Sequence, residues 1–285
     1  MSATPSYILR ISCPDTVGIV ARVSSFLADS RAFIEESSHY GDADTMQFFM
    51  RTRFRLTGDN NINEVIEGFG VVAEAYDMQW DLRPSEERSK VIIMVSKQDH
   101  CINDLLYKVK SGSLKMDVVA VVSNHKDLMS LCQWYNLPFY HVPVTPENKQ
   151  EAEEKLSNIV SQYEADLVIL ARYMQILSER FCTIHSGHII NIHHSFLPSF
   201  KGARPYHRAY EKGVKLIGAT AHYVTSDLDE GPIIEQVVER VTHVHHVEEL
   251  VSVGKDVECL TLARAVKYHI EGRVFLNGAK TVVFK

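Results

Sequence analysis

Apolar and polar positions follow two different rhythms along the chain, with the change near residue 84. In the first part, apolar residues recur every three to four positions in 19–27 and 61–76, which predicts two amphipathic helices. Turn residues separate four runs typical of strands, at 7–11, 34–40, 46–54 and 78–82. The resulting order β-α-β-β-α-β predicts a ferredoxin-like domain, in which helices pack on one face of an antiparallel sheet.

The second part alternates short, strongly apolar runs with helical stretches. Val, Ile and Leu dominate four of the runs, as in strands buried on both faces: 91–95, 118–122, 167–170 and 189–192. Helical spacing fills the intervals at 102–109, 128–135 and 147–163. This alternation predicts an α/β domain with a Rossmann-like, mostly parallel sheet, which binds ligands at the carboxyl ends of its strands.

A polar stretch separates the two parts. Residues 82–90 read LRPSEERSK, and all but the first are polar or Pro. We therefore expect a first domain at 1–83, a linker at 84–90 and a second domain at 91–285. A length of 285 residues is in keeping with two domains.

Composition narrows the classes of function. The formal charge is −6 and the Lys and Arg residues are scattered, so a nucleic-acid partner is not expected. The chain lacks both a long uncharged apolar run and a signal-peptide pattern, so we expect a cytoplasmic protein without a membrane partner. The five cysteines lack the spacing of a metal site, so we expect reduced thiols and no metal. A small-molecule ligand is the expected partner.

Polar side chains gather directly after the apolar run that ends at Ile190. Asn191 and His193 lie two positions apart, so in extended backbone they project to the same side. A carboxamide donates hydrogen bonds to an oxyanion, and an imidazole exchanges protons near neutral pH. Asp229, beyond a predicted strand at 219–224, offers a carboxylate that orients an imidazole or a water. Together they suit attack on a carbonyl group, although an Asn-x-His spacing alone is common by chance.

Two longer segments resemble a known family. NIHHSFLPSFKGARPYHRAY (191–210) and GATAHYVTSDLDEGPIIEQ (218–236) contain Asn-Ile-His, Ser-x-Leu-Pro and Asp-x-Gly-Pro in that order. They are similar to the folate-dependent formyltransferase family, and the likeness covers most of 90–285. It implies that Asn191 and His193 stabilise an oxyanion and that Asp229 manages protons and water.

The resemblance also implies a pocket for a pterin ring. ARYMQIL (171–177) matches the family's strand-end segment that walls this pocket, through Met174, Ile176 and Leu177, and Leu228 would face the same space. Relatives often have Arg where this chain has Gln175, which leaves that contact open.

The branches of this family differ in the molecule that accepts the formyl group. A transferase that acts on a phosphorylated amine holds the phosphate at a Gly- and Ser-rich turn after the first strand. Here that turn, VSKQDHC (95–101), has no glycine and contains Asp99, and a basic C-terminal domain for tRNA is not matched. His194 stands where transferases usually have Pro. The chain therefore resembles the deformylase branch, which implies hydrolysis of 10-formyltetrahydrofolate to formate and tetrahydrofolate for purine biosynthesis, without a bound cofactor.

Several polar residues near the predicted site have two interpretations each. His194 either binds the formyl group or water, or closes a turn. His222 either belongs to the site or is satisfied by a neighbouring carbonyl group. Lys201, Arg204 and His207 either meet the glutamate tail of a folate or form a solvated turn.

The first domain resembles a regulatory module. CPDTVGIVARVSSFL (13–27) is similar to the first loop and helix of ACT domains, which implies either an amino-acid effector such as Gly or Met, or a role in oligomerisation alone. We expect a homodimer or homotetramer, because ferredoxin-like sheets often pair edge to edge. Two alternatives for the whole chain stay open: a formyltransferase with a non-phosphorylated or sugar amine as acceptor, and a catalytically silent folate or amino-acid sensor.

Overall fold

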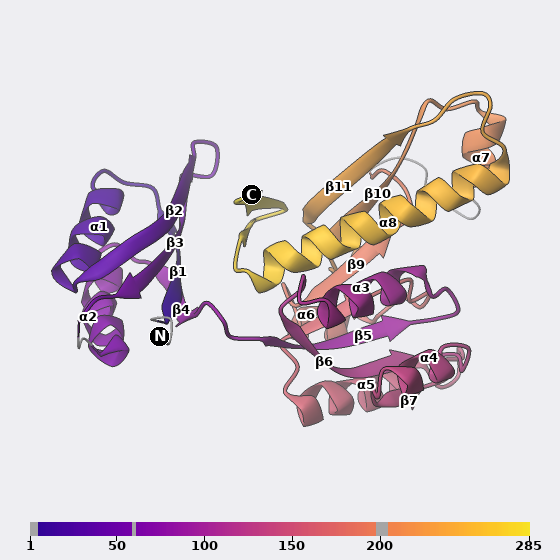
Figure 1. The fold of residues 1–285 in the computed structure, drawn as a ribbon, viewed down its shortest axis with the longest axis horizontal. Helices are drawn as coiled ribbons and strands as arrows, with labels where there is room; N and C mark the ends of the chain where they lie inside the picture. The colour runs from indigo at the N-terminus through magenta and orange to yellow at the C-terminus, as the bar shows by residue number, and fades with distance from the viewer. Residues whose placement is uncertain (1–4, 59–60, 198–204) are drawn as a thin grey trace. The chain divides into compact units, whose positions relative to one another are not determined.

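The computed structural model describes residues 5–58, 61–197 and 205–285 (Figure 1). The chain divides into two compact units, one of residues 1–87 with 271–285 and one of residues 88–270. The boundary at residue 87 lies within the predicted linker. The structure departs from the predicted division at residues 271–285, which fold with the first unit through contacts far apart in sequence.

The first unit has the predicted order of elements. Its helices and strands are β1 (Ser6–Pro14), α1 (Ile19–Asp29), β2 (Ala32–Asp42), β3 (Gln47–Leu56), α2 (Ile62–Ala75) and β4 (Gln79–Pro84). Among the described residues the four strands form a sheet in the order β2-β3-β1-β4, antiparallel in each pair. Helix α2 begins where it does because Asn61 Oδ1 accepts a hydrogen bond from Asn63 N at 3.0 Å, a side-chain N-cap.

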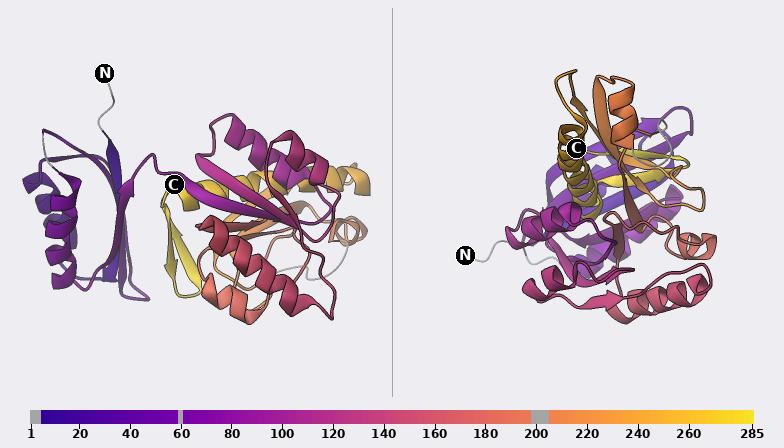
Figure 2. Two further views of the ribbon diagram at one scale, coloured as in Figure 1. Left: turned by 90° about the horizontal axis from the view of Figure 1, so that it is seen from below. Right: turned by 90° about the vertical axis from the view of Figure 1, so that its right-hand side faces the viewer.

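Successive side chains of β3 point to opposite faces of this sheet. Phe48, Met50 and Phe54 point into a core with α1 and α2. On the opposite face the hairpin of β12 (Val274–Asn277) and β13 (Lys280–Val283) packs against the sheet (Figure 2). The rings of Phe49 and Phe275 lie 5.7 Å apart there.

Charged side chains fix this hairpin to the sheet. Arg10 Nη2 donates to Val274 O at 2.6 Å, and its guanidinium stacks over the Phe275 ring at 4.6 Å. Asn277 Nδ2 donates to buried Asp42 at 2.6 Å. Residues 271–285 therefore complete the first unit.

The second unit is built on a mostly parallel sheet, as predicted. Its strands are β5 (Ser89–Val95), β6 (Met116–Ser123), β7 (Phe139–His141), β8 (Leu167–Leu170), β9 (Ile189–His193), β10 (Leu216–Tyr223) and β11 (Ile233–Arg240). In the described part of the chain their order is β11-β10-β9-β8-β5-β6-β7, with only β10 antiparallel to its neighbours. Val91–Val95 of β5 are fully buried, which explains why central strands have continuous apolar runs.

Helices cover both faces of the second sheet. They are α3 (His100–Lys110), α4 (Met129–Trp134), α5 (Lys149–Tyr163), α6 (Glu179–Ile184), α7 (Pro205–Glu211) and α8 (Val247–Ile270). Helices α5 and α6 pack on one face around Leu156 and Phe181. Helix α8 crosses β9, β10 and β11 and contacts α3 (Figure 1). Within the described ranges, the helices are all too short or too polar to cross a membrane.

We predict that Phe275→Ala destabilises the first unit by about 3 kcal/mol or more, because it empties a buried aromatic site. Urea unfolding followed by Trp80 fluorescence in a Trp134→Phe background isolates the first unit, since the chain has two Trp residues and Trp80 packs in that core. Leu276→Ala is the matched control, because Leu276 is 46% exposed on the same strand. Equal losses for the two variants would contradict the packing described.

Candidate active site

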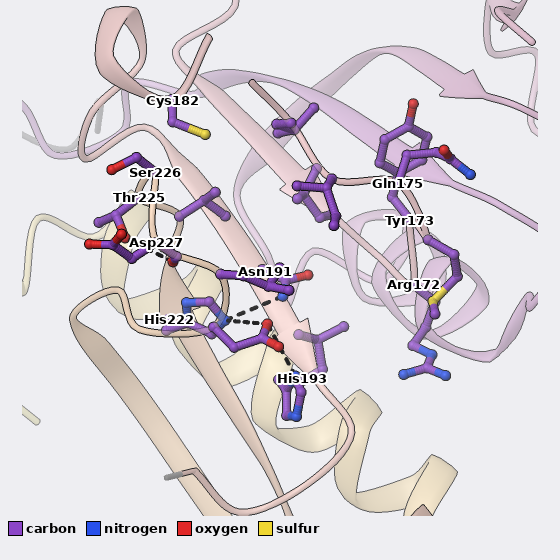
Figure 3. Close-up of a pocket in the computed structure, with 18 of the residues that line it drawn as sticks. Arg172, Tyr173, Gln175, Cys182, Asn191, His193, His222, Thr225, Ser226 and Asp227 are labelled. Carbon is purple, nitrogen blue, oxygen red and sulfur yellow. Dashed lines mark hydrogen bonds and ion pairs between the residues drawn. The ribbon is translucent and has the colours of Figure 1, made fainter. Parts of the chain in front are cut away.

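The carboxyl ends of β8 and β9 lie at one edge of the second sheet. The loop between β10 and β11 meets them there. In β9 the period of two turns Asn191 and His193 to one side, while Ile192 is buried on the other. The antiparallel register pairs Asn191 directly with His222 of β10. Figure 3 shows Asn191, His193 and His222 around one space, with Arg172 and Gln175 across it.

His222 orients the carboxamide of Asn191. Its ring Nδ1 lies 2.8 Å from the carbonyl oxygen of Tyr223, to which it donates. Burial lowers the pKa of His222, so the ring is neutral and Nε2 is an acceptor. Asn191 Nδ2 lies 3.3 Å from that Nε2 and donates one of its two N–H groups. A neighbouring carbonyl group thus satisfies one nitrogen of His222, and the other contacts Asn191; a role of His222 in the reaction stays a prediction.

A strained loop returns Asp229 to the same space. Asp229 has φ 59°, in the left-handed region that Asp tolerates better than most residues. Two residues later, a Cβ on Gly231 would lie 1.8 Å from the carbonyl oxygen of Tyr223, so only glycine fits. Tyr223 N donates to Pro232 O at 2.9 Å, which closes the loop.

Asp229 and His193 form an ion pair when the imidazole is protonated. Asp229 Oδ1 lies 3.2 Å from His193 Nδ1 and 3.9 Å from His222 Nε2. The hydrogen bond from His193 outweighs burial and holds the pKa of Asp229 below its ordinary value. His193 Nε2 is buried without a hydrogen-bond partner in the described part of the chain. This nitrogen is therefore the one available to a ligand.

A cavity of about 250 Å³ lies against these groups. All eight residues predicted for the site line it: Met174, Ile176, Leu177, Asn191, His193, His194, Leu228 and Asp229. Their being lining residues agrees with the prediction, while their individual roles stay predictions. Gln175 also lines the cavity.

One side of the cavity is an apolar rim. Met174, Ile176 and Leu228 are 60%, 58% and 58% exposed, unusual values for side chains of their size grouped at one opening. Leu177, by contrast, is buried behind them. The cavity thus has a polar end at Asn191 and a solvent-exposed apolar edge that a flat ring would cover.

The sequence prediction left out a buried cluster beside the site. Glu258 of α8 is buried against His100, Tyr206 and Arg172, and Arg172 also lines the cavity. No local sequence pattern marked this cluster, because its members come from four separate segments. Lys201 and Arg204 lie outside the described residues, and His207 is exposed on α7.

Comparison with known proteins agrees with this geometry. Residues 89–266 match the formyl transferase family. A formyltetrahydrofolate deformylase of Corynebacterium sp. (strain P-1) is 46% identical over 100% of both chains. The chain belongs to the formyltetrahydrofolate deformylases of the formyl transferase family.

Solved structures give the same relationship. The formyltetrahydrofolate deformylase from Burkholderia mallei ATCC 23344 has a TM-score of 0.95 and 50% identity, over 99% of this chain and 100% of that one. A phosphoribosylglycinamide formyltransferase from Anaplasma phagocytophilum has a TM-score of 0.62 and 31% identity, over 70% of this chain and 96% of that one. The formyl transferase fold thus also occurs in similar proteins that bear a transferase name.

His194 is held neutral in this member of the deformylase family. Its ring stacks on that of His193 with centroids 5.1 Å apart. Burial, together with the charge of Arg172 and the neighbouring His193, lowers the pKa of His194 to about 4. The unfolded chain takes up a proton at this residue near pH 6.5, whereas the folded chain does so only near pH 4. The contribution of neutral His194 to the free energy of unfolding is therefore present above pH 6.5 and is lost as the pH falls toward 4.

Proton uptake by His194 lowers the free energy of unfolding of the parent chain between pH 7 and pH 5. We predict that this decrease is smaller by about 1–2 kcal/mol in His194→Asn, because the variant lacks this proton uptake. Urea unfolding at the two pH values measures it. His207→Asn, which removes an exposed His, should lose as much stability as the parent chain. A His194→Asn variant with an unchanged loss would show that His194 is protonated in the folded state at pH 5.

Proposed function

We propose that this chain hydrolyses 10-formyltetrahydrofolate to formate and tetrahydrofolate. The observation that carries the proposal is the single cavity in which Asn191, His193 and Asp229 face one small space. The relatives with 46% and 50% identity are named formyltetrahydrofolate deformylases, and they match this chain along its whole length. Formate released in this way supplies purine biosynthesis and rebalances one-carbon units.

The formyl oxygen lies at the polar end of the cavity in the proposed complex. Asn191 has one N–H group engaged by His222, which leaves the other for this oxygen. Protonated His193 donates Nδ1–H to Asp229 and has Nε2–H for the same oxygen. Two donors held before the reaction starts stabilise the negative charge that develops on the oxygen.

Asp229 handles the nucleophile in this proposal. Its second oxygen accepts a proton from a water that attacks the formyl carbon, which gives a tetrahedral intermediate. The C–N bond then breaks as the proton held by Asp229 passes to N10, and the formic acid produced loses its proton to solvent and leaves as formate. The hydrogen bond from His193 lowers the pKa of Asp229, so the carboxylate is ionised over the physiological range and carries no proton when the water binds.

The apolar rim accounts for the folate part of the substrate. Met174, Ile176 and Leu228 present exposed apolar surface next to the polar end, which suits a pterin ring with its formyl group pointing inward. His194 is neutral and stacked on His193, so it contributes a hydrogen-bonding wall without charge. The proposed reaction needs neither a metal nor a resident cofactor.

For the first unit we propose a ferredoxin-like, ACT-like regulatory role. The element order β-α-β-β-α-β and the sheet order β2-β3-β1-β4 support it. Such a unit would bind an amino-acid effector, Gly or Met, or pair with a second copy in a homodimer or homotetramer. We propose a cytoplasmic enzyme that acts on a small molecule and has no nucleic-acid partner.

We predict that Asn191→Ala and Asp229→Asn each lower kcat for formate release by about 100- to 1,000-fold, because each removes a group that acts in the transition state. The assay is purified protein with 10-formyltetrahydrofolate alone, followed by formate. Asn158→Ala and Asp127→Asn make the same chemical changes at exposed positions away from the cavity and should retain the parent rate.

The same assay separates the alternatives. Formate released without an added amine favours the hydrolase over a transferase. A folate-dependent rise in melting temperature without any formate would instead support a silent sensor. Parent-like turnover by Asn191→Ala would remove the oxyanion role from the carboxamide.

A further inference from the structure

The second sheet changes direction at β5, and the resulting crevice is crossed by protein side chains. Strands β6 and β7 follow on one side of β5 while β8 and β9 lie on the other, so the carboxyl ends of β5 and β8 form a topological switch point. Open α/β sheets bind ligands in the crevice at such a point. Here Met174 N donates to Ser96 Oγ at 3.0 Å, and Arg172 Nε donates to Gln98 Oε1 at 2.9 Å.

The buried carboxylate of Glu258, on helix α8, contacts Arg172 from the other side of these hydrogen bonds. Glu258 of α8 is 1% exposed. One of its oxygens lies 2.7 Å from His100 Nε2 and 3.4 Å from Arg172 Nε, and the other accepts from Tyr206 Oη at 2.9 Å. Burial opposes ionisation, but the hydrogen bond from His100 and the charge of Arg172 keep the pKa of Glu258 below its ordinary value. Gln98, His100, Arg172, Tyr206 and Glu258 are called the crevice cluster below.

The local backbone is shaped around the crevice cluster. Arg172 has φ 65°, which costs about 1–2 kcal/mol for a residue with a side chain. One turn before Glu258, a Cβ on Gly254 would lie 2.2 Å from the Tyr206 ring, so this glycine allows the ring to reach the carboxylate. Strain of this kind persists where the surrounding contacts over-determine it, and it gathers at functional sites.

The crevice cluster adjoins the proposed catalytic groups. Arg172 lines the same cavity as Asn191, His193 and His194. Figure 3 shows Arg172 and His193 among the side chains that line this cavity. A second substrate that attacked the formyl carbon from the switch point would have to occupy the volume filled by these side chains.

Resting on the proposed hydrolysis, we propose that the crevice cluster is the specificity determinant of this enzyme: it closes the switch-point crevice to an amine acceptor and so leaves water as the nucleophile. The fold itself does not decide between the two reactions, because a similar structure with 31% identity is named a phosphoribosylglycinamide formyltransferase. The difference must lie in what fills the space beside the formyl group. In this proposal water, the smaller nucleophile, reaches the formyl carbon past Arg172, and an amine on a carbon skeleton does not.

A metal is a poorer explanation of the same residues. His100, Cys101 and Glu258 offer ligand atoms within 4.8 Å of one another. The Glu258 oxygen that faces His100 also faces the Arg172 guanidinium, however, and its other oxygen accepts from Tyr206. A cation would have to displace a positive group from a carboxylate that is already neutralised.

The test is the partition of the formyl group between water and a small amine. The parent chain and its variants are incubated with 10-formyltetrahydrofolate and glycinamide, and formate and N-formylglycinamide are quantified by mass spectrometry. Opening the crevice with the paired change Arg172→Gly and Glu258→Gln removes both charges together. We expect the ratio of N-formylglycinamide to formate to rise about tenfold or more.

A milder variant keeps the test decisive if the paired change does not fold. Gln98→Gly shortens an exposed side chain of the turn and leaves the ion pair in place, and it should raise the same ratio by a smaller factor. Lys97→Gly, at the exposed neighbouring position, is the matched control and should keep the parent ratio.

The outcomes separate this inference from the proposed function. Parent enzyme that releases formate, with folded variants whose ratio stays at the parent value, overturns the crevice cluster as the determinant and leaves the hydrolysis intact. Parent enzyme that releases no formate overturns the hydrolase assignment, and the closed crevice with it. A higher ratio in Gln98→Gly but not in Lys97→Gly supports the proposal.

Discussion

The antiparallel pairing of β10 with β9 is the constraint on which the site depends. Its register sets His222 opposite Asn191, and a shift of β10 by one residue would turn His222 to the other face. The same strand ends at Tyr223, whose backbone accepts from His222, donates to Pro232 and leaves room only for Gly231. Backbone hydrogen bonds thus place the carboxamide, and the loop that they close brings Asp229 to the imidazole of His193.

Asp229 and Glu258, two carboxylates near the cavity, have separate partners. His194 and His222 both have lowered pKa values and add no charge, so Asp229 has His193 as its single hydrogen-bonding imidazole within the described residues. Close by, Glu258 is matched by Arg172 and His100. The proposed chemistry and the proposed closure of the crevice therefore rest on different carboxylates.

The parts of this structure that local pattern determines were predictable. The buried strands β5 and β8 read as unbroken apolar runs, and Asn191 with His193 stood out because polar groups directly followed such a run. The order of elements in the first unit followed from periodicity in the same way. All eight residues expected at the site line one cavity, since parallel strands deliver their carboxyl ends to a common edge.

What escaped prediction depends on contacts between distant segments. The role of His222 comes from strand register, which its own sequence does not reveal. Glu258 lies in a helix whose buried face also contains Thr261, so the apolar periodicity that marks simpler helices is interrupted. The strands of residues 274–283 are short and mixed in polarity, and their partners Arg10 and Phe49 lie at the other end of the chain. That last pairing also sets an order of events on the ribosome. The sheet of the first unit is synthesised early, but one of its faces stays exposed to water until residues 271–285 leave the exit tunnel. Completion of the first unit therefore follows synthesis of the whole second unit.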